Sequence, residues 1–262
     1  MDILTHTLSG VAAGIVVSTF TKKGFWNKTA IVTIGGFGGA LPDFDAISLW
    51  SKFDTTIGKF FNLSHSGAEI YSGKFFYSHH AFLHSVFAAF LISFLIGIGV
   101  FVFSKKKSFD TLVKTFYKIK FFLISFILGF IIHLTEDMPT PSSSWSGVNF
   151  LWPSSKYIGG TGDIWWWNNY DVFLIVLLVI LISLLILAIK KYIKFDIRII
   201  LVSIFVFGTI FSLVQIKNRD FNFNNSSYVD CEMKSKEIQK EILGEKLFYI
   251  MESFDNNMNL NF

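Results

Sequence analysis

The sequence predicts an all-α membrane protein, a polytopic bundle of about four to six membrane helices followed by a small polar C-terminal tail. Three observations support this fold class. Apolar residues make up 52% of the 262 residues, and the mean hydropathy is +0.52. They form long runs separated by short lysine clusters, a pattern typical of chains that cross a bilayer several times. The runs stop near residue 216, so we expect a membrane domain over 1–216 and a polar tail over 217–262.

Six membrane-associated helices are predicted within the first domain. The last four contain the most continuous apolar runs, whereas the first two are shorter and rich in Gly, Ser and Thr. Small residues allow helices to approach one another closely, so the first two helices are expected to pack against protein rather than lipid. Their glycines are Gly10, Gly14, Gly35, Gly36, Gly38 and Gly39. The predicted ranges are 3–20, 29–45, 79–103, 119–137, 171–189 and 197–216.

The distribution of lysine and arginine predicts the orientation of the helices. Loops 21–28, 104–120 and 190–198 would lie on one side of the membrane, and together they carry 13 of these residues. The other side, formed by 46–78, 138–170 and the end of the last helix, carries 6. Because cytoplasmic loops are enriched in positive charge, the first set is expected to face the cytoplasm. The chain would then be a multi-pass protein of the inner (cytoplasmic) membrane with both termini outside.

Composition excludes several kinds of site. The net charge of +4 is modest and the lysines lie in loops, which argues against a nucleic-acid partner. A single cysteine, Cys231, allows neither an internal disulfide nor a thiolate metal site. Lys22 and Lys23 follow the first apolar run instead of preceding it, which is unlike a cleaved signal peptide. Any metal ion would therefore need histidine and carboxylate ligands.

The fourth helix ends in the most informative pattern, His133, Glu136 and Asp137, closed by Pro139. On a helix, residues i and i+4 lie on the same face, so His133 and Asp137 project together. An imidazole and a carboxylate one turn apart can chelate a metal ion. The alternative is that these polar residues only mark the point where the chain leaves the lipid.

Two more groups fall on the same predicted side of the membrane. The LPDFD motif places Asp43 and Asp45 after Pro42, and carboxylates this close repel one another unless a cation lies between them. His6 opens the first helix on that side. An ionisable side chain at mid-bilayer costs roughly 2.5–3.5 kcal/mol, so a cluster of such groups in a membrane domain indicates function.

The SHHAFLHS motif opens the third predicted helix on this side as well. Ser78 is the predicted N-cap of that helix, and His80 and His84 are i, i+4 partners. His79 and His84 are five residues apart, so they converge only if His79 precedes the first helical turn.

The candidate metal ligands exceed the four that one tetrahedral ion needs. We therefore expect one or two divalent ions. Two ions would share a bridging carboxylate, an arrangement typical of phosphoester hydrolysis. Mixed imidazole and carboxylate ligands favour Zn, with Mn or Fe as alternatives. Asp45 and Glu136 are the candidate general acid and base. The candidate metal ligands are His6, Asp43, Asp45, His79, His84, His133 and Asp137.

Five short motifs follow one another over about residues 1–155. They are T-H-x-x-x-G from Thr5, L-P-D-x-D from Leu41, H-x4-H-S from His79, H-x-x-x-D from His133 and L-W-P from Leu151. In this order they resemble the motifs of the YdjM-like inner-membrane proteins, a family of predicted metal-dependent hydrolases. The resemblance implies a membrane-embedded metal site and hydrolase activity.

The chain departs from the family pattern within the third motif. The family usually has Arg-Gly after the first histidine and Thr before the second, whereas this chain has His80, Ala81 and Leu83. The role of His80 and any arginine contact to an anionic substrate therefore do not carry over. A fold-level analogy also exists to zinc-dependent phospholipases C, which combine an early histidine, an aspartate and an H-x-x-x-D helix.

The preferred hypothesis is a metal-dependent hydrolase that cleaves an ester or phosphodiester of a lipid or lipid-linked substrate at the outer membrane face. A metal ion can lower the pKa of a coordinated water toward 7, and a site at headgroup depth favours membrane lipids as partners. The alternative is a non-enzymatic metal-ion transporter or sensor, although transport sites usually lie near mid-membrane on broken helices. A bis-histidine haem site and a nucleophilic Ser85 beside His84 are weaker alternatives.

Three remaining features have simpler interpretations. His65 is expected to be a surface residue of the 46–78 loop. Trp165–Trp167 predict an aromatic belt at the headgroup level, or alternatively a stacking platform for a substrate. Residues 232–252 show loose amphipathic periodicity, which predicts a short helix packed on the loops or lying on the membrane.

Overall fold

The computed structural model describes residues 2–104, 108–140, 147–160, 164, 168–218 and 228–257. Within these ranges the chain is mainly helical and forms no strand, and an isolated bridge pairs Val148 with Ile158. The predicted all-α fold is therefore confirmed. The α-helices are α1 (Ile3–Ser18), α2 (Phe25–Ala40), α3 (Gly67–Ser72), α4 (Val86–Val102), α5 (Phe109–Asp137), α6 (Tyr170–Ala188), α7 (Ile197–Lys217) and α8 (Tyr228–Asn257). The shorter helical segments are η1 (Pro42–Leu49), η2 (Asp54–Gly58), η3 (Phe82–His84) and η4 (Lys190–Tyr192).

Most of these helices are suited to a membrane. In the described part of the chain, α5, α6 and α7 are long and apolar enough to cross one. The pair α2 and η1 is a fourth candidate, bent by 48° at the break between its two segments. The helices α1 and α4 are apolar but shorter, at 16 and 17 residues. Together these elements correspond to the six membrane-associated helices that the sequence predicts.

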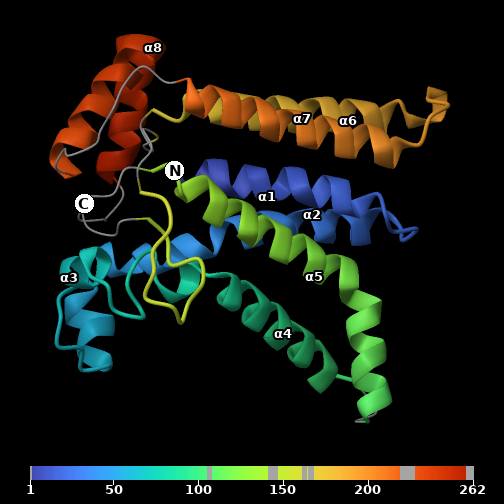
Figure 1. Cartoon of the computed structure of the whole chain (residues 1–262), viewed down its shortest axis with the longest axis horizontal. Helices are drawn as coiled ribbons and strands as arrows, with labels where there is room; N and C mark the ends of the chain where they lie inside the picture. The colour runs from blue at the N-terminus through green and yellow to red at the C-terminus, as the bar shows by residue number, and fades with distance from the viewer. Residues whose placement is uncertain are drawn as a thin grey trace.

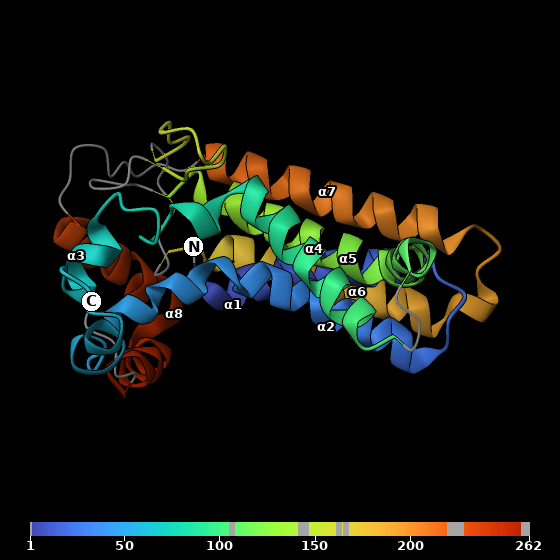
Figure 2. The ribbon, with the colours of Figure 1, turned by 90° about the horizontal axis from the view of Figure 1, so that it is seen from below.

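The bundle has two chemically different ends (Figure 1). At one end α1 begins and α5 finishes, close to α3 and α8; we call this the histidine end. The α1–α2 and α6–α7 turns lie at the other end, which we call the lysine end, and the view from below keeps this arrangement (Figure 2). Lys23 Nζ donates a hydrogen bond to the carbonyl oxygen of Lys118 (3.1 Å), so two lysine-rich segments meet there.

Glycines bring α1, α2 and α5 into close contact. A Cβ atom added at Gly10 would lie 2.2 Å from the carbonyl oxygen of Gly35, and one at Gly129 would lie 2.1 Å from the same atom. A Cβ added at Gly39 would lie 2.2 Å from the carbonyl oxygen of His6. The prediction that small residues allow close helix packing here is confirmed, and this packing places the start of α1 beside the end of α5.

The remaining membrane helices pack on this three-helix centre from two sides. Helix α4 contacts α5, and the α6–α7 hairpin contacts α1 (Figure 1). The buried residues of the first contact are Ala88, Ala89, Phe126, Phe130 and Leu134. Those of the second are Ala12, Ile15, Ile180 and Leu201. The polar site described below lies where α1, α5 and the start of α4 meet.

Three predicted helix boundaries are wrong for local reasons. Helix α5 begins at Phe109 rather than at residue 119, because the Ser108 side chain caps it there by accepting from Thr111 N–H. The range 29–45 is not one helix: α2 stops at Ala40 and, because Pro42 has no N–H to continue the α-helical pattern, the chain goes on as the 3₁₀ helix η1. In the range 79–103 the α-helix begins only at Val86, where the Ser85 side chain accepts a hydrogen bond from Ala88 N–H. Ser78 is not the N-cap, since its hydroxyl accepts from Phe75 N–H instead. His79 therefore precedes the helix, the condition stated above for its convergence with His84.

The polar tail contains a longer helical segment than predicted. Helix α8 covers the predicted range 232–252 and extends beyond it at both ends, but it is broken at Gly244, which has a φ of 72°. The amide of Gln239 contacts the sulfur of Met251 at 3.4 Å across this break, so the two halves fold back on one another. The predicted aromatic belt Trp165–Trp167 lies outside the described residues.

Candidate metal centre

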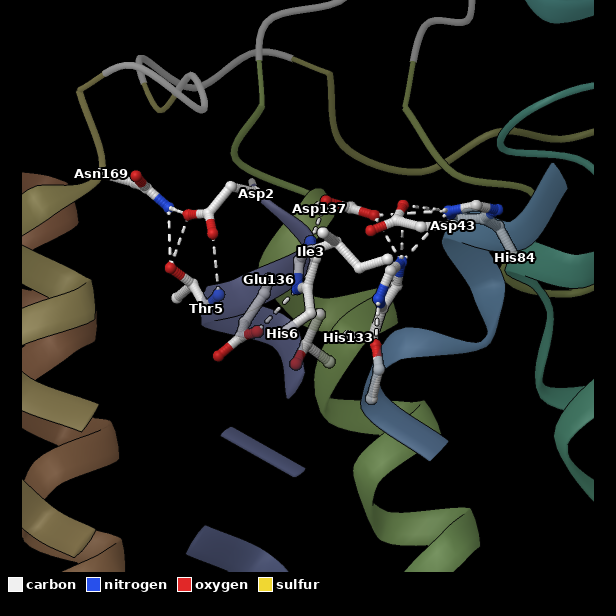
Figure 3. A network of polar contacts seen from close by, with 12 residues as sticks. Asp2, Ile3, Thr5, His6, Asp43, His84, His133, Glu136, Asp137 and Asn169 are labelled. Carbon is white, nitrogen blue, oxygen red and sulfur yellow. Dashed lines mark hydrogen bonds and ion pairs between the residues drawn. The ribbon is translucent and has the colours of Figure 1, made fainter. Parts of the chain in front are cut away.

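Four segments bring the candidate ligands together at the histidine end (Figure 3). They are the first turn of α1, the segment η1 after the bend, the irregular chain before α4, and the last turn of α5. Glycine packing between α1, α2 and α5 sets the spacing of three of these segments. The side chains that they carry are His6, Asp43, His79, His80, His84, His133 and Asp137.

The end of α5 supplies two of these side chains. His133 and Asp137 share one face of the helix as predicted, with Nε2 of His133 lying 2.9 Å from Oδ2 of Asp137. The other ring nitrogen, Nδ1, donates a hydrogen bond to the carbonyl oxygen of Gly39 at 2.7 Å. A carbonyl oxygen can only accept, so Nδ1 of His133 carries the proton. Nε2 of the neutral ring then presents a lone pair to the site.

Helix α1 supplies His6, which is fully buried. Its Nδ1 donates to Oε2 of Glu136 at 2.8 Å, and Oε1 of the same glutamate accepts from the Ser9 hydroxyl at 2.5 Å. Nε2 of His6 lies 3.0 Å from Oδ1 of Asp137. Glu136 thus holds the Nδ1 side of the His6 ring, while Nε2 of His6 faces the carboxylate of Asp137, which His133 also faces.

The short helix η3 supplies His84, which is also fully buried. Its Nδ1 lies 3.1 Å from Oδ2 of Asp45. On the other side of the ring, Nε2 lies 3.2 Å from Nε2 of His133, 3.4 Å from Oδ2 of Asp137 and 3.9 Å from Oδ1 of Asp43. The two aspartates of the LPDFD motif therefore face opposite nitrogens of His84, and only Asp43 faces the common centre.

His79 and His80 reach the site because the backbone between them is unusual. Nδ1 of His79 donates to Oδ1 of Asp45 at 2.6 Å, and its ring stacks on Tyr71. His80 has a φ of 63°, a left-handed conformation that costs a residue with a side chain of order 1–3 kcal/mol. Its carbonyl oxygen accepts from Asn149 N–H, and its Nδ1 lies 3.1 Å from the carbonyl oxygen of Gly147. The segment 147–149 therefore holds His80 in the site, while Asp45 holds His79.

The side chains form two adjoining groups, each able to hold a metal ion. His6, Asp43, His133 and Asp137 offer ligand atoms that all lie within 4.8 Å of one another; we call this the helix group. The loop group, defined the same way, consists of His79, His80 and His84. Oδ2 of Asp137 lies 2.9 Å from His133 in the first group and 3.4 Å from His84 in the second, so this carboxylate stands between them.

The donor set of this region matches a cation site. Nδ1 of each of the five clustered histidines faces an oxygen atom, which for Gly39 and Gly147 is a carbonyl and for Asp45 and Glu136 a carboxylate. With Nδ1 protonated, each Nε2 is left as a lone pair, the form in which imidazole binds metal. The lone pairs of His84 and His133 would then face each other at 3.2 Å beside two carboxylates. Such an arrangement is stable only with a proton or a metal ion between them.

The pKa values of His80 and His84 are shifted in opposite directions. Burial by itself lowers the pKa of His84, but the carboxylates of Asp45 and Asp137 outweigh burial and raise this pKa to about 9. Burial, together with the neighbouring rings of His79 and His84, holds the pKa of His80 well below its usual value. A neutral ring is ready to bind metal, whereas a protonated ring must first release its proton. A metal ion therefore competes with a proton at His84.

The structure brings most of the predicted site residues into contact, but in different positions. Asp45 belongs to neither group, because both of its oxygens bind the Nδ1 atoms of His79 and His84. Glu136 likewise belongs to neither group, and its carboxylate accepts a hydrogen bond from Nδ1 of His6. His80, whose role the sequence leaves open, is a member of the loop group. His65 is half-buried and stacks on Phe75, and it belongs to neither group.

Sequence reasoning missed the residues that support the ligands. The carbonyl oxygens of Gly39 and Gly147 accept from ligand histidines, and backbone atoms leave no signal in side-chain chemistry. Phe150 accepts a hydrogen bond from Val86 N–H, and Trp152 of the L-W-P motif packs on Phe82 with ring centroids 5.0 Å apart. The segment 147–153 is therefore a strap that contacts His80 and the chain on both sides of His84, and the L-W-P motif is its signal in the sequence.

A second polar network connects the α6–α7 hairpin to α1, the helix that carries His6 (Figure 3). The Asp2 side chain caps α1 by accepting from Thr5 N–H at 2.9 Å. The Asn169 amide donates to Asp2 and, at 3.1 Å, to the Thr5 hydroxyl. Asn169 immediately precedes α6, so the start of this helix is fixed one residue away from His6.

Comparison with known families agrees with this geometry. The model of the YdjM inner membrane protein family matches residues 1–219, most of the chain. The chain belongs to this family. The YdjM match includes α1 to α7 and every residue of the two groups, whereas α8 lies beyond it. Searches of the curated proteins and of the solved structures found no match.

Proposed function

We propose that the protein is a membrane-embedded, metal-dependent hydrolase that cleaves an ester or phosphodiester bond of a lipid or lipid-linked substrate. The observation that carries the proposal is the convergence of buried imidazole nitrogens and two carboxylates at the histidine end. A divalent cation held by these ligands supplies the Lewis acidity that activates water for attack on such a bond. Among divalent ions, mixed imidazole and carboxylate ligands favour Zn over Ca or Mg.

The two adjoining groups suit a pair of ions. The helix group offers His6, Asp43 and His133, the loop group offers three imidazoles, and Asp137 reaches both. A carboxylate shared between two ions is a common feature of phosphoester hydrolases. A pair of ions can stabilise both the attacking and the leaving oxygen of a phosphodiester. For this reason we favour the phosphodiester over the carboxylic ester.

Asp45 and Glu136 act in this proposal through the histidines that they hold. Each binds Nδ1 of a ligand ring, which fixes the tautomer and raises the basicity of Nε2. These positions suit positioning residues better than the general acid and base roles that sequence alone predicts.

The location of the site supports a lipid substrate. The groups lie at the ends of α1 and α5, where a bundle of this length would meet the lipid headgroups. The lysine-rich turns lie at the other end, which under the positive-inside rule faces the cytoplasm. We therefore propose that the site acts on the extracytoplasmic leaflet of the inner membrane.

Metal content tests the proposal directly. The purified wild-type protein and the double variant His133→Ala/Asp137→Ala are compared by elemental analysis after dialysis. We expect one or two Zn, Mn or Fe ions per wild-type chain and a loss of metal in the variant. His65→Ala is the matched control, because this histidine belongs to neither group and should leave the metal content unchanged. Equally low metal in the wild type and the double variant contradicts the proposal.

Activity is tested on the metal-loaded protein with bis(4-nitrophenyl) phosphate, a chromogenic phosphodiester. Hydrolysis should disappear in the double variant and persist in His65→Ala. A protein that binds metal but cleaves neither this ester nor the lipids of a reconstituted membrane contradicts the hydrolase assignment.

One observation favours a second function, metal-ion transport. The bent pair α2 and η1 has the length and composition of a broken span or a re-entrant loop, and transporters often place their ion sites at breaks in a helix. Asp43 lies just after this break and belongs to the helix group. Metal uptake into proteoliposomes by the wild type, lost in Asp43→Ala, would favour transport over hydrolysis.

A further inference from the structure

A cavity of about 540 Å³ lies between the α6–α7 hairpin and helices α1 and α5. It is separate from the metal ligands, since none of the residues in either group lines it. Pockets that bind small molecules typically measure about 300–1,000 Å³, so the space is large enough for part of a ligand. Its walls are formed largely by the helices that can cross a membrane.

The dimensions of the cavity match one leaflet of a bilayer. Along α7 its lining extends from Phe205 to Ile216, a stretch ~16 Å long at the helical rise. The hydrocarbon core of a bilayer is ~30 Å thick, so the cavity covers about half of it. The lining also extends from Ile132, near the end of the helix α5 that carries His133 and Asp137, to Pro139 just beyond it. The cavity therefore occupies the half of the bundle nearest the metal centre.

The chemistry of the lining fits an alkyl chain with a polar group at one end. Most of the lining is aliphatic, as at Val172, Val176 and Val179. The only charged residue on its described walls is Glu136, which also holds Nδ1 of His6. An apolar chain gains ~0.8 kcal/mol for each methylene that it buries, whereas a charged or strongly hydrated ligand would lose its water here without compensation.

We propose that this cavity binds one apolar chain of a membrane lipid and thereby seats a lipid substrate beside the metal centre. The occupant is a lipid of the leaflet at the histidine end, with its chain between α5 and α7 and its polar part at the level of Glu136. The inference rests on the proposed function in one respect, that the bound lipid is the substrate. It narrows the substrate class to lipids with a long alkyl or isoprenoid chain.

Photolabelling tests the proposal without relying on turnover. The protein is reconstituted in nanodiscs that contain a phosphatidylethanolamine with a diazirine in the middle of one acyl chain. After irradiation, labelled peptides are identified by mass spectrometry. We expect labels on the cavity faces of α5 and α7, including Ile132 and Ile216, in addition to the general labelling of lipid-facing residues such as Phe207.

A filling substitution with a matched control makes the test decisive. Ser212→Phe places an aromatic ring in the cavity, whereas Ser203→Phe makes the same change on the opposite face of α7. Labelling of the cavity faces should fall several-fold in Ser212→Phe and remain at the wild-type level in Ser203→Phe. Thr209→Phe is a second filling variant, in case Ser212→Phe does not fold. Cavity labelling that is absent from the wild type, or that survives both filling variants, overturns the proposal.

Metal content separates this inference from the proposed function. The double variant His133→Ala/Asp137→Ala should lose its metal but keep cavity labelling, because its substitutions do not line the cavity. If labelling fails while wild-type metal content is normal, the lipid seat is wrong and the metal centre stands. If cavity labelling succeeds while the wild-type protein holds no metal, the lipid seat stands and the metal centre is wrong.

Discussion

The two halves of the candidate metal centre are built in different ways. The helix group is carried by α1, α5 and the 3₁₀ helix η1, and its spacing is set by glycine contacts between α1, α2 and α5. The loop group lies in irregular chain before α4 and includes a residue in the left-handed conformation. Rigid packing fixes the first half, whereas hydrogen bonds from Asp45 and from the strap 147–153 fix the second. The halves should therefore fail in different ways when they are perturbed.

The largest effect is expected from crowding the helix group. Gly39→Ala would place a Cβ 2.2 Å from the carbonyl oxygen of His6, so α1 and α2 must separate. Overpacking of this kind typically costs ~1–3 kcal/mol in the free energy of unfolding. Because His133 also binds the carbonyl of Gly39, metal content should fall as well. Thermal unfolding and elemental analysis measure the two effects.

A second glycine provides the control for this prediction. Gly99 lies in α4, and a Cβ added there meets no atom within 4 Å. Gly99→Ala should leave metal content unchanged and should not destabilise the fold, because alanine is the better helix former by ~0.5–1 kcal/mol. Equal melting temperatures for the two variants would show that close packing does not set the helix group.

The second largest effect is expected at the carboxylates behind the ligand histidines. Asp45 binds Nδ1 of both His79 and His84, whereas Glu136 binds only that of His6. Loss of such a partner typically costs 10–100-fold in metal affinity, equivalent to ~1.4–2.8 kcal/mol. We expect Asp45→Asn to weaken binding more than Glu136→Gln, measured by competition with a fluorescent chelator. A larger effect of Glu136→Gln would mean that the helix group binds the tighter ion.

The same contrast explains how much the sequence could predict. The i, i+4 spacing of His133 and Asp137 predicts their geometry directly, because a helix has a fixed period. Glycine-rich α1 and α2 likewise predict close packing. The helical period says nothing about the chain outside a helix. The sequence therefore places the SHHAFLHS motif at the start of a helix, whereas α4 begins only after it, at Val86. The type and order of the residues thus identify the ligands, but they do not identify the residues that hold the ligands in place.

The positions of Asp43 and Asp45 show most clearly what the sequence alone does not predict. Two carboxylates separated by one residue suggest a shared cation, yet they face opposite nitrogens of His84. Their directions depend on η1 being a 3₁₀ helix after a 48° bend, and on His84 lying between them in space. Both facts arise from tertiary packing of segments about 40 residues apart, which local propensity does not encode.

The smallest effect is expected from loosening the junction between the loop group and α4. Ser85 caps α4 by accepting from Ala88 N–H, and Ser108 caps α5 by accepting from Thr111 N–H. Replacing either by alanine should cost ~1 kcal/mol of stability, because one helix-end donor loses its partner. Only Ser85 follows a ligand, so only Ser85→Ala should also reduce metal affinity, while Ser108→Ala serves as the matched control at the lysine end. Stability by thermal unfolding and affinity by chelator competition separate the two contributions. If both variants bind metal as tightly as the wild type, Asp45 and the strap 147–153 order the loop histidines without any contribution from the start of α4.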